Sequence, residues 1–342
     1  MKNILVTGGA GYIGSHTIIE LIKKGYNPIV FDNFSNSTDK SLKLINEYFK
    51  KELTVINGDI INMEDLDEVF KQYGFDGIVH FAGCLEVGES MINPIKYYKN
   101  IVSGSINLVE LANKYNVKNI VFSSTAGVYG IPNVSVISED TIINPINTYG
   151  KAKYMVERIL EDASRAYGIR SIRLRYFNVA GASEIIKIGE AHRSESHLIP
   201  NILLNILGIK NGFKLFGNDY NTKDGTCVRD YIYVCDLALA HVKAIEVLES
   251  NEKNDFSIPI NLGTKSGYSN LEIIKTCEDV TGKTLNYETV DRRPGDPDKL
   301  VADNTKAMEV LNWRPTASLK QIIQSAWNWH SSIEYIEALG VK

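Results

Sequence analysis

A tyrosine and a lysine stand four residues apart in the string YGKAK, at Tyr149 and Lys153. On a helix, this spacing places both side chains on one face. A free phenol has a pKa of about 10, but a nearby cation stabilises its phenolate form. Such a phenolate can take a proton from a substrate hydroxyl. Because surface helices often carry a tyrosine and a lysine at this spacing, the pair alone does not decide the chemistry.

Hydroxyl side chains precede this pair in the string FSSTAGVYG. They follow a short apolar segment, which places them at the end of an expected strand. Thr125 can hydrogen-bond the oxygen of a reacting group. Ser123 and Ser124 are read equally well as caps of backbone groups.

A glycine-rich turn lies near the amino terminus, in the string TGGAGYIG. Gly9, Gly11 and Gly14 fit a dinucleotide-binding loop, in which the backbone must turn tightly and approach a pyrophosphate. Gly8, Gly11 and Gly14 fit it equally well. Asp32 follows at the distance where a carboxylate binds a ribose hydroxyl, and its charge favours NAD over NADP. Asp59 either holds the adenine edge or is an ordinary turn aspartate.

Short apolar strands and amphipathic helices alternate through the first half of the chain. Strands are expected at residues 3–6, 28–31, 53–56, 77–82, 119–122 and 171–175. This alternation predicts an α/β fold of the Rossmann type, a doubly wound parallel sheet covered on both faces. Long helices are expected at residues 92–116 and 149–167.

The alternation ends near Phe177, and the following segments are shorter and richer in Gly, Asn and Pro. We therefore expect an NAD-binding Rossmann domain over 1–177, rejoined by a segment near 230–260. Residues 178–342 are expected to form mainly a smaller mixed α/β lobe that binds the substrate. Ligands of open α/β sheets bind beyond the carboxyl ends of the strands, which places the active site between the two parts.

The composition excludes several other classes of protein. Lys and Arg total 37 against 41 Asp and Glu, so no uniform basic field exists for nucleic acid. No apolar run approaches the length of a membrane span, and no export signal is recognised, so a cytoplasmic location is expected. The four cysteines are scattered without a CxxC pair, which argues against structural zinc, and no metal site is predicted.

Taken together, these strings resemble the extended short-chain dehydrogenase/reductase family, and within it the UDP-hexose 4-epimerases. The resemblance covers nearly the whole chain. It rests on TGGAGYIGSH, FDN, GDI, HFAG, FSSTAGVYG, YGKAK, RYFNVAGA, FGNDYNTKDGT, VRDYI and RRPGDP.

The resemblance implies tightly bound NAD+, a UDP-hexose substrate and a set of site residues. The implied catalytic residues are Tyr149, Lys153 and Thr125. Those implied for the cofactor are Gly8, Gly11, Tyr12, Ile13, Gly14, Asp32, Asn33, Asn36, Ser37, Asp59, Ile60, Phe81, Ala82, Gly83, Asn100, Tyr149 and Lys153. Those implied for the substrate are Thr125, Tyr149, Asn178, Phe216, Arg229, Arg293, Asp296 and Leu300.

The implied reaction interconverts UDP-galactose and UDP-glucose. Hydride leaves C4 of the sugar, the 4-keto intermediate rotates, and hydride returns to the opposite face. Two positions bear on this expectation. Leu85 stands where the family usually has a lysine near the cofactor, so NAD is held more weakly or another cation substitutes. Leu300 stands at the position that limits N-acetylated sugars, and its intermediate size leaves UDP-N-acetylglucosamine and UDP-N-acetylgalactosamine as alternative substrates.

Two other readings remain. A nucleotide-sugar 4,6-dehydratase needs an acid and a base after the threonine, where this chain has Ala126 and Gly127. A non-catalytic NAD-binding protein could dispense with Tyr149 and Lys153, yet both are present. The two expected long helices are of the kind that pair between subunits in this family, so a homodimer is expected.

Overall fold

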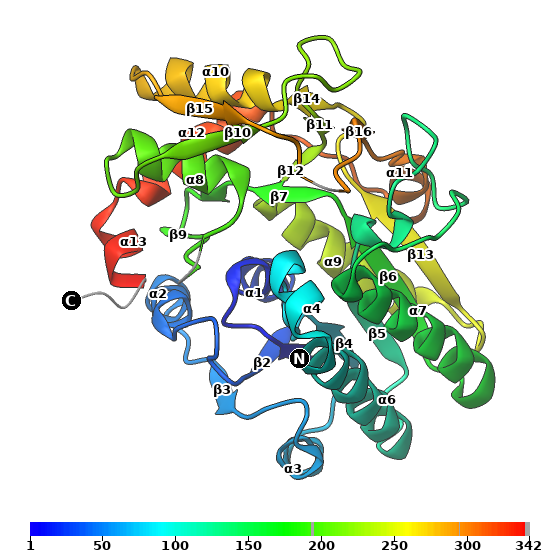
Figure 1. The fold of residues 1–342 in the computed structure, drawn as a ribbon. Coiled ribbons are helices and arrows are strands. Elements are labelled where there is room, and N and C mark those ends of the chain that lie inside the picture. Colours follow the sequence, from blue (N-terminus) through cyan, green and yellow to red (C-terminus); the bar gives the residue numbers. More distant parts are fainter. Residues whose placement is uncertain (193–194, 294, 339–342) are drawn as a thin grey trace.

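A seven-stranded parallel sheet forms the centre of the computed structural model, which describes residues 1–192, 195–293 and 295–338 (Figure 1). The strand order is β13-β6-β5-β4-β1-β2-β3. This confirms the predicted doubly wound α/β fold. The strands are β1 (Asn3–Thr7), β2 (Asn27–Asp32), β3 (Thr54–Asn57), β4 (Gly77–His80), β5 (Asn119–Thr125), β6 (Arg170–Tyr176) and β13 (Ser257–Leu262).

The central strands are continuous apolar runs because helices cover both faces of the sheet. In β1, the side chains of Ile4, Leu5 and Val6 are all inaccessible to solvent. Val6 pairs with Val30 of β2 on one side and with Val79 of β4 on the other. The apolar pattern thus fixes the strands that carry the loops of the site.

Two layers of helices cover the two faces of the sheet, each with its own hydrophobic cluster. One layer comprises α1 (Tyr12–Lys23), α2 (Lys40–Phe49), α9 (Val234–Ser250) and α11 (Thr305–Leu311). The other comprises α3 (Met63–Gln72), η1 (Tyr98–Ser103), α6 (Gly104–Lys114) and α7 (Thr148–Tyr167).

The long helix expected at 149–167 is present as α7, but the one expected at 92–116 is not a single helix. The chain breaks at Asn93, whose backbone has φ −126° and ψ 64°. Pro94 then starts a new turn, because proline fits the first turn of a helix but cannot continue one. The segment becomes α4 (Val87–Ile92), α5 (Pro94–Tyr97), the π-helical η1 and α6.

The second part of the chain forms small sheets and helices above the carboxyl ends of the strands (Figure 1). Its core lies between α8, α10 and α12. Its helices are α8 (Leu198–Ile206), α10 (Asn270–Thr281), α12 (Leu319–His330) and α13 (Ile333–Ala338). Its strands are β7 (Asn178–Ala180), β8 (Ala182–Ser183), β9 (Ile188–Gly189), β10 (Phe213–Phe216), β11 (Val228–Arg229), β14 (Tyr268–Ser269), β15 (Tyr287–Val290) and β16 (Lys299–Leu300).

Between these elements, the chain returns once to the large sheet. β12 (Tyr231–Tyr233) pairs with β7, α9 packs on α1, and β13 takes the edge position beside β6. Ile260 of β13 lies opposite Leu174, and both side chains are fully buried. No helix within the described residues is long and apolar enough to cross a membrane.

Candidate active site

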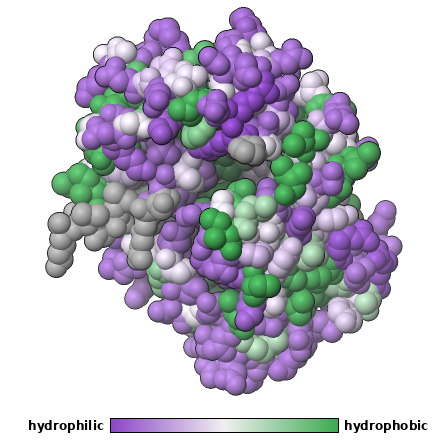
Figure 2. Space-filling model, in the orientation of Figure 1, coloured by the Kyte–Doolittle hydropathy of each residue, from purple (hydrophilic) through white to green (hydrophobic). Residues whose placement is uncertain are grey.

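A cleft of about 1010 Å³ opens where the carboxyl ends of the strands meet the second part of the chain. Figure 2 shows the hollow between the upper and lower parts of the molecule. The cleft collects every residue that the sequence indicated for catalysis, cofactor and substrate, except one. Those that line it are Gly8, Gly11, Tyr12, Ile13, Gly14, Asp32, Asn33, Asn36, Ser37, Asp59, Ile60, Phe81, Ala82, Gly83, Asn100, Thr125, Tyr149, Lys153, Asn178, Phe216, Arg229, Arg293 and Asp296.

Leu300 is the exception, because it lies on β16 behind the wall of the cleft. β16 pairs with β11, which places Leu300 beside Arg229. The Leu300 side chain packs against the cluster that contains Phe177, and Phe177 does line the cleft. Leu300 therefore does not line the cleft itself. It packs behind Phe177, which does.

The glycine turn after β1 forms a tight cradle at the amino terminus of α1. Gly8 has a φ of +70°, and a Cβ there would lie 2.7 Å from the backbone nitrogen of Ala82. A Cβ on Gly14 would lie 2.4 Å from the carbonyl oxygen of Gly8. Side chains are thus excluded, and the backbone N–H groups at the start of α1 face an open space. This is the arrangement that receives a dinucleotide pyrophosphate.

Asp32 at the end of β2 fixes the next part of the cradle. Its carboxylate accepts hydrogen bonds from the backbone of Ala10 at 2.9 Å, the backbone of Phe34 at 2.9 Å and the Ser37 hydroxyl at 3.0 Å. Asp32 thereby ties the glycine turn to the loop after β2. A carboxylate here suits a ribose diol and repels a 2′-phosphate, so the residues present fit NAD.

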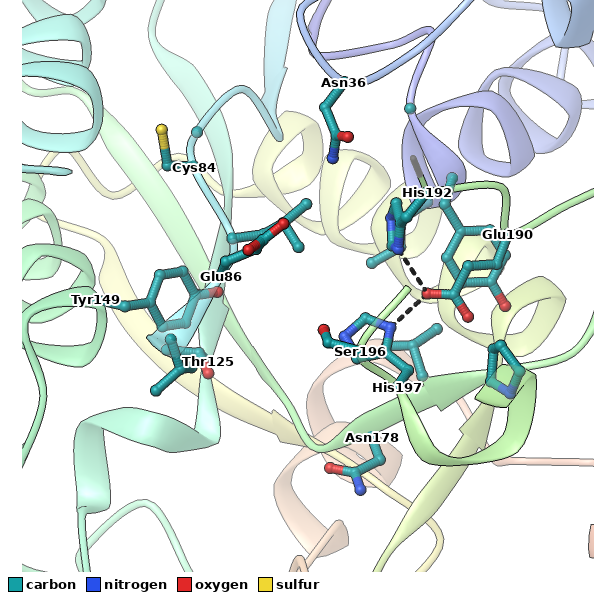
Figure 3. Close-up of a pocket in the computed structure, with 18 of the residues that line it drawn as sticks. Asn36, Cys84, Glu86, Thr125, Tyr149, Asn178, Glu190, His192, Ser196 and His197 are labelled. Atoms are coloured by element: carbon teal, nitrogen blue, oxygen red, sulfur yellow. Dashed lines mark hydrogen bonds and ion pairs between the residues drawn. The ribbon is translucent and has the colours of Figure 1, made fainter. Parts of the chain in front are cut away.

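Tyr149 and Lys153 lie on the first turns of α7, at the floor of the cleft. Asn147 caps this helix by accepting a hydrogen bond from the Gly150 backbone at 2.8 Å. The Lys153 ammonium donates to the carbonyl of Ser123 at 2.8 Å. The Thr125 and Tyr149 side chains lie next to each other, so the ends of β5 and α7 meet at this point (Figure 3).

Burial dominates the electrostatics of this pair in the protein alone. Desolvation raises the pKa of Tyr149 to about 12, although the neighbouring Thr125 hydroxyl opposes the rise. Desolvation also lowers the pKa of Lys153 to about 8. The expected lowering of the tyrosine pKa requires a positive nicotinamide ring as well as Lys153, so the protein alone does not test it, and it stays a prediction.

Cationic and aromatic groups line the far end of the cleft. Arg229 of β11 lies 3.4 Å from the carboxylate of Asp296. The guanidinium of Arg293 stacks on the ring of Phe216, 4.0 Å from its centre. Planar guanidinium groups suit the geometry of phosphates, and an aromatic ring suits a nucleobase.

Comparisons with known proteins agree with this arrangement. Residues 5–326 match a family model described as GDP-mannose 4,6 dehydratase. The UDP-glucose 4-epimerase of Bacillus subtilis (strain 168) is 46% identical over 332 residues, covering 96% of this chain and 97% of the relative. The solved UDP-glucose 4-epimerase of Bifidobacterium longum, in complex with NAD+ and UDP, is 38% identical with a TM-score of 0.91, covering 96% and 98% of the two chains. The chain belongs to the UDP-glucose 4-epimerase family.

A UDP-glucose 4-epimerase is an isomerase, whereas the matching family model is described as a 4,6 dehydratase. A third solved structure, the UDP-Glc/GlcNAc 4-epimerase of Campylobacter jejuni, has a TM-score of 0.84 at 37% identity, covering 96% and 99% of the two chains. In this chain Ala126 and Gly127 follow Thr125 and begin the 3-10 turn η2 (Ala126–Tyr129). Neither residue can transfer a proton, which favours an epimerase over a dehydratase.

The cleft of this family member also contains polar residues that our sequence analysis missed. Glu190, His192, Ser196 and His197 line it between β9 and α8 (Figure 3). The repeated Glu and His of GEAH and ESH were a visible signal, but their spacing matched no motif that we considered. Lys96 lines the cleft as well, as does Leu85. Lys96 pairs with Glu89 at 2.6 Å, so a cation remains near the position from which the family lysine is missing.

Proposed function

We propose that this cleft inverts C4 of a UDP-hexose, interconverting UDP-galactose and UDP-glucose, with Tyr149 as the catalytic base. The observation that carries the proposal is the meeting of three parts in one cleft: the dinucleotide cradle, the Tyr149–Thr125 pair, and the Arg229–Arg293 end. NAD, when bound, supplies the hydride acceptor and a positive charge. The cradle residues that would hold it are those indicated by the sequence, from Gly8 to Asn100.

In this proposal Tyr149 takes the proton of the C4 hydroxyl and later returns it. Thr125 is assigned to hydrogen-bond the sugar oxygen, since its side chain lies beside the Tyr149 phenol in the cleft (Figure 3). Lys153 is anchored on Ser123 and supplies a fixed positive charge below the phenol. All three residues with a role in proton transfer therefore lie at the floor of the cleft.

The two parts of the chain bind different ligands in this proposal. We assign NAD to residues 1–177 together with the returning segment near 230–260. The remainder, from 178 onward, holds the nucleotide sugar, apart from residues 193–194, 294 and 339–342, which lie outside the described residues. Arg229 and Arg293 contact the diphosphate, Asp296 the uridine ribose, Phe216 the uracil, and Asn178 the phosphate end of the sugar.

A second candidate is a dual-specificity enzyme that also accepts UDP-N-acetylglucosamine and UDP-N-acetylgalactosamine. It is favoured by the position of Leu300, behind the cleft wall and without an aromatic ring that would narrow the pocket. The similarity to the UDP-Glc/GlcNAc 4-epimerase of Campylobacter jejuni points the same way. Leu300→Tyr should then lower turnover of N-acetylated sugars more than that of UDP-galactose.

The first experiment uses the purified protein with UDP-galactose and, separately, with UDP-N-acetylgalactosamine, with and without added NAD. Conversion of UDP-galactose alone supports the narrow enzyme, and conversion of both supports dual specificity. Dependence on added NAD would show weak retention, for which the neutral Leu85 is the first residue to test. No conversion of either sugar under any condition would contradict the proposal.

We also propose a homodimer, supported by apolar side chains on neighbouring helices. Met91, Ile92, Ile95, Ile106 and Met155 are all exposed, on α4, the start of α5, α6 and α7. These helices pack against one another. Large exposed apolar side chains on neighbouring helices support an interface. Sedimentation that finds only monomer would contradict this.

The four free cysteines suit a reducing compartment, and we propose the cytoplasm.

A further inference from the structure

Four side chains with metal-binding chemistry gather on the cleft wall, away from Tyr149. Glu190 and His192 follow β9, and Glu195 and His197 precede α8. One potential ligand atom from each of the four lies within 4.8 Å of all the others. Figure 3 shows the Glu190 carboxylate between the two imidazole rings, joined to both by dashed lines. Two carboxylates and two imidazoles thus face a common centre.

The distances between imidazole nitrogens and carboxylate oxygens are close to those between the ligands of a tetrahedral ion. Nδ1 of His192 lies 3.3 Å from Oε1 of Glu190 and 3.6 Å from Oε2 of Glu195. Nδ1 of His197 contacts the same Glu190 oxygen and lies 3.8 Å from Oε1 of Glu195. Ligand bonds of about 2.1 Å in a tetrahedron separate the ligand atoms by about 3.4 Å. Small side-chain rotations therefore suffice to admit an ion.

The backbone around these ligands is anchored by further hydrogen bonds. The indole of Trp329 donates to the Glu190 carbonyl at 2.7 Å. The backbone N–H of His197 donates to the Glu195 carboxylate at 2.8 Å, and the Lys210 ammonium donates to the Glu195 carbonyl at 3.1 Å. Such outer contacts orient metal ligands before the ion arrives. The Glu190 and Glu195 side chains are each only 2% exposed, so their negative charges require a cationic partner. Protonated His192 and His197 supply that charge in the absence of a metal, and a divalent ion would supply it in place of their protons.

We propose that Glu190, His192, Glu195 and His197 bind one divalent transition-metal ion, with Zn2+ as the ion that fits best. Imidazole nitrogens with carboxylate oxygens suit Zn2+, whereas Mg2+ and Ca2+ prefer oxygen ligands alone. Two carboxylates and neutral imidazoles balance the charge of one divalent ion. A bound ion fixes the segment that enters α8 along the wall of the cleft. The proposal does not depend on the proposed epimerase reaction.

The test uses the full-length protein, treated with a chelator, dialysed, and titrated with Co2+ and then with Zn2+. We expect one Co2+ per chain, with the intense visible bands of a tetrahedral site that Zn2+ bleaches by displacement. X-ray absorption of the Zn2+-loaded protein should report imidazole among the ligands. Both readouts use the unaltered protein, so they do not depend on a variant that folds.

Variants then localise the site. His192→Ala and Glu190→Gln should each weaken metal binding at least tenfold, while Asp162→Asn, at an exposed carboxylate on α7, should leave it unchanged. Circular dichroism checks that each variant is folded. The proposal would be overturned if no stoichiometric binding were found or if the Co2+ spectrum were octahedral. It would also be overturned if the folded His192 and Glu190 variants bound the metal as tightly as the unaltered protein. The four side chains would then be an ion-pair cluster only.

Discussion

The Lys153 ammonium lies 5.9 Å from the centre of the Tyr149 ring, one turn further along the same face of α7. In the protein alone, desolvation raises the pKa of Tyr149 to about 12. In the proposed function the positive charge of bound NAD opposes this rise, so we expect proton transfer by Tyr149 to depend on an occupied cofactor cradle.

Removing the phenolic oxygen should separate chemistry from binding. We expect Tyr149→Phe to lower the rate of UDP-galactose conversion by about 10²- to 10⁴-fold, the usual contribution of a positioned acid–base group. The NAD content, measured after acid release, should remain that of the unaltered protein. Tyr154→Phe is the matched control, since Tyr154 lies on the same helix outside the cleft lining. Near-normal turnover in Tyr149→Phe would contradict the assigned base.

Lys153 should make the stability of the NAD-free protein depend on pH. Its folded pKa of about 8 lies below the unfolded value of 10.5, so the unfolded chain binds more protons between these values. Stability must therefore rise with pH across that window, by about 2 kcal/mol between pH 7.5 and 9.5. Urea unfolding of the unaltered protein and of Lys153→Met measures this rise as a difference. Equal pH slopes in the two proteins would show that burial does not shift this lysine.

The glycine cradle should not tolerate one added carbon. Gly14→Ala places a Cβ 2.4 Å from the Gly8 carbonyl oxygen, so backbone must move. We expect a loss of about 1–3 kcal/mol in unfolding free energy, typical of overpacking, together with reduced NAD content. Gly74→Ala is the control, because a Cβ there meets nothing within 4 Å. If both variants retain the same amount of NAD per chain, the turn is not the pyrophosphate site.

Arg293 and its neighbour offer a paired test of nucleotide recognition. Arg293 stacks on Phe216 inside the cleft, whereas Arg292 pairs with Asp219 outside its lining. Arg293→Lys keeps the charge but loses the planar fork and the stacking. We expect its KM for UDP-galactose to rise about tenfold with kcat nearly unchanged, which indicates lost uniform binding. Arg292→Lys should change KM by less than twofold, and the reverse order would contradict the assignment of Arg293.

Much of the fold was predictable because its signals are local. Buried parallel strands such as β1 are continuous apolar runs, and the glycine turn with Asp32 has a fixed spacing from them. The break at Asn93 was not predicted, because the apolar spacing continues across Pro94 and hides the change of helix. Pro94 was itself the local signal for this break, since a proline cannot continue a helix.

The site was predictable where residues follow strands and less so where loops converge. Thr125 could be placed from the sequence because it ends a strand of the parallel sheet, and Tyr149 because it begins a long helix. The pKa of Tyr149 could not be predicted from the sequence, since it depends on how completely the cleft excludes water. The cluster of Glu190 and His197 was also missed, because residues from the two ends of one irregular segment meet only after that segment folds back.

The edge strand β13 makes the two parts of the molecule inseparable. It completes the sheet beside β6, yet the chain reaches it only after building β7 to β12. A polypeptide cut after Phe177 would leave β6 as an open edge, with Ile172 and Leu174 deprived of their partner strand. Open apolar edges pair with other chains, so such a fragment should aggregate. During synthesis, the nascent sheet must therefore wait for about 80 further residues before its last edge is closed.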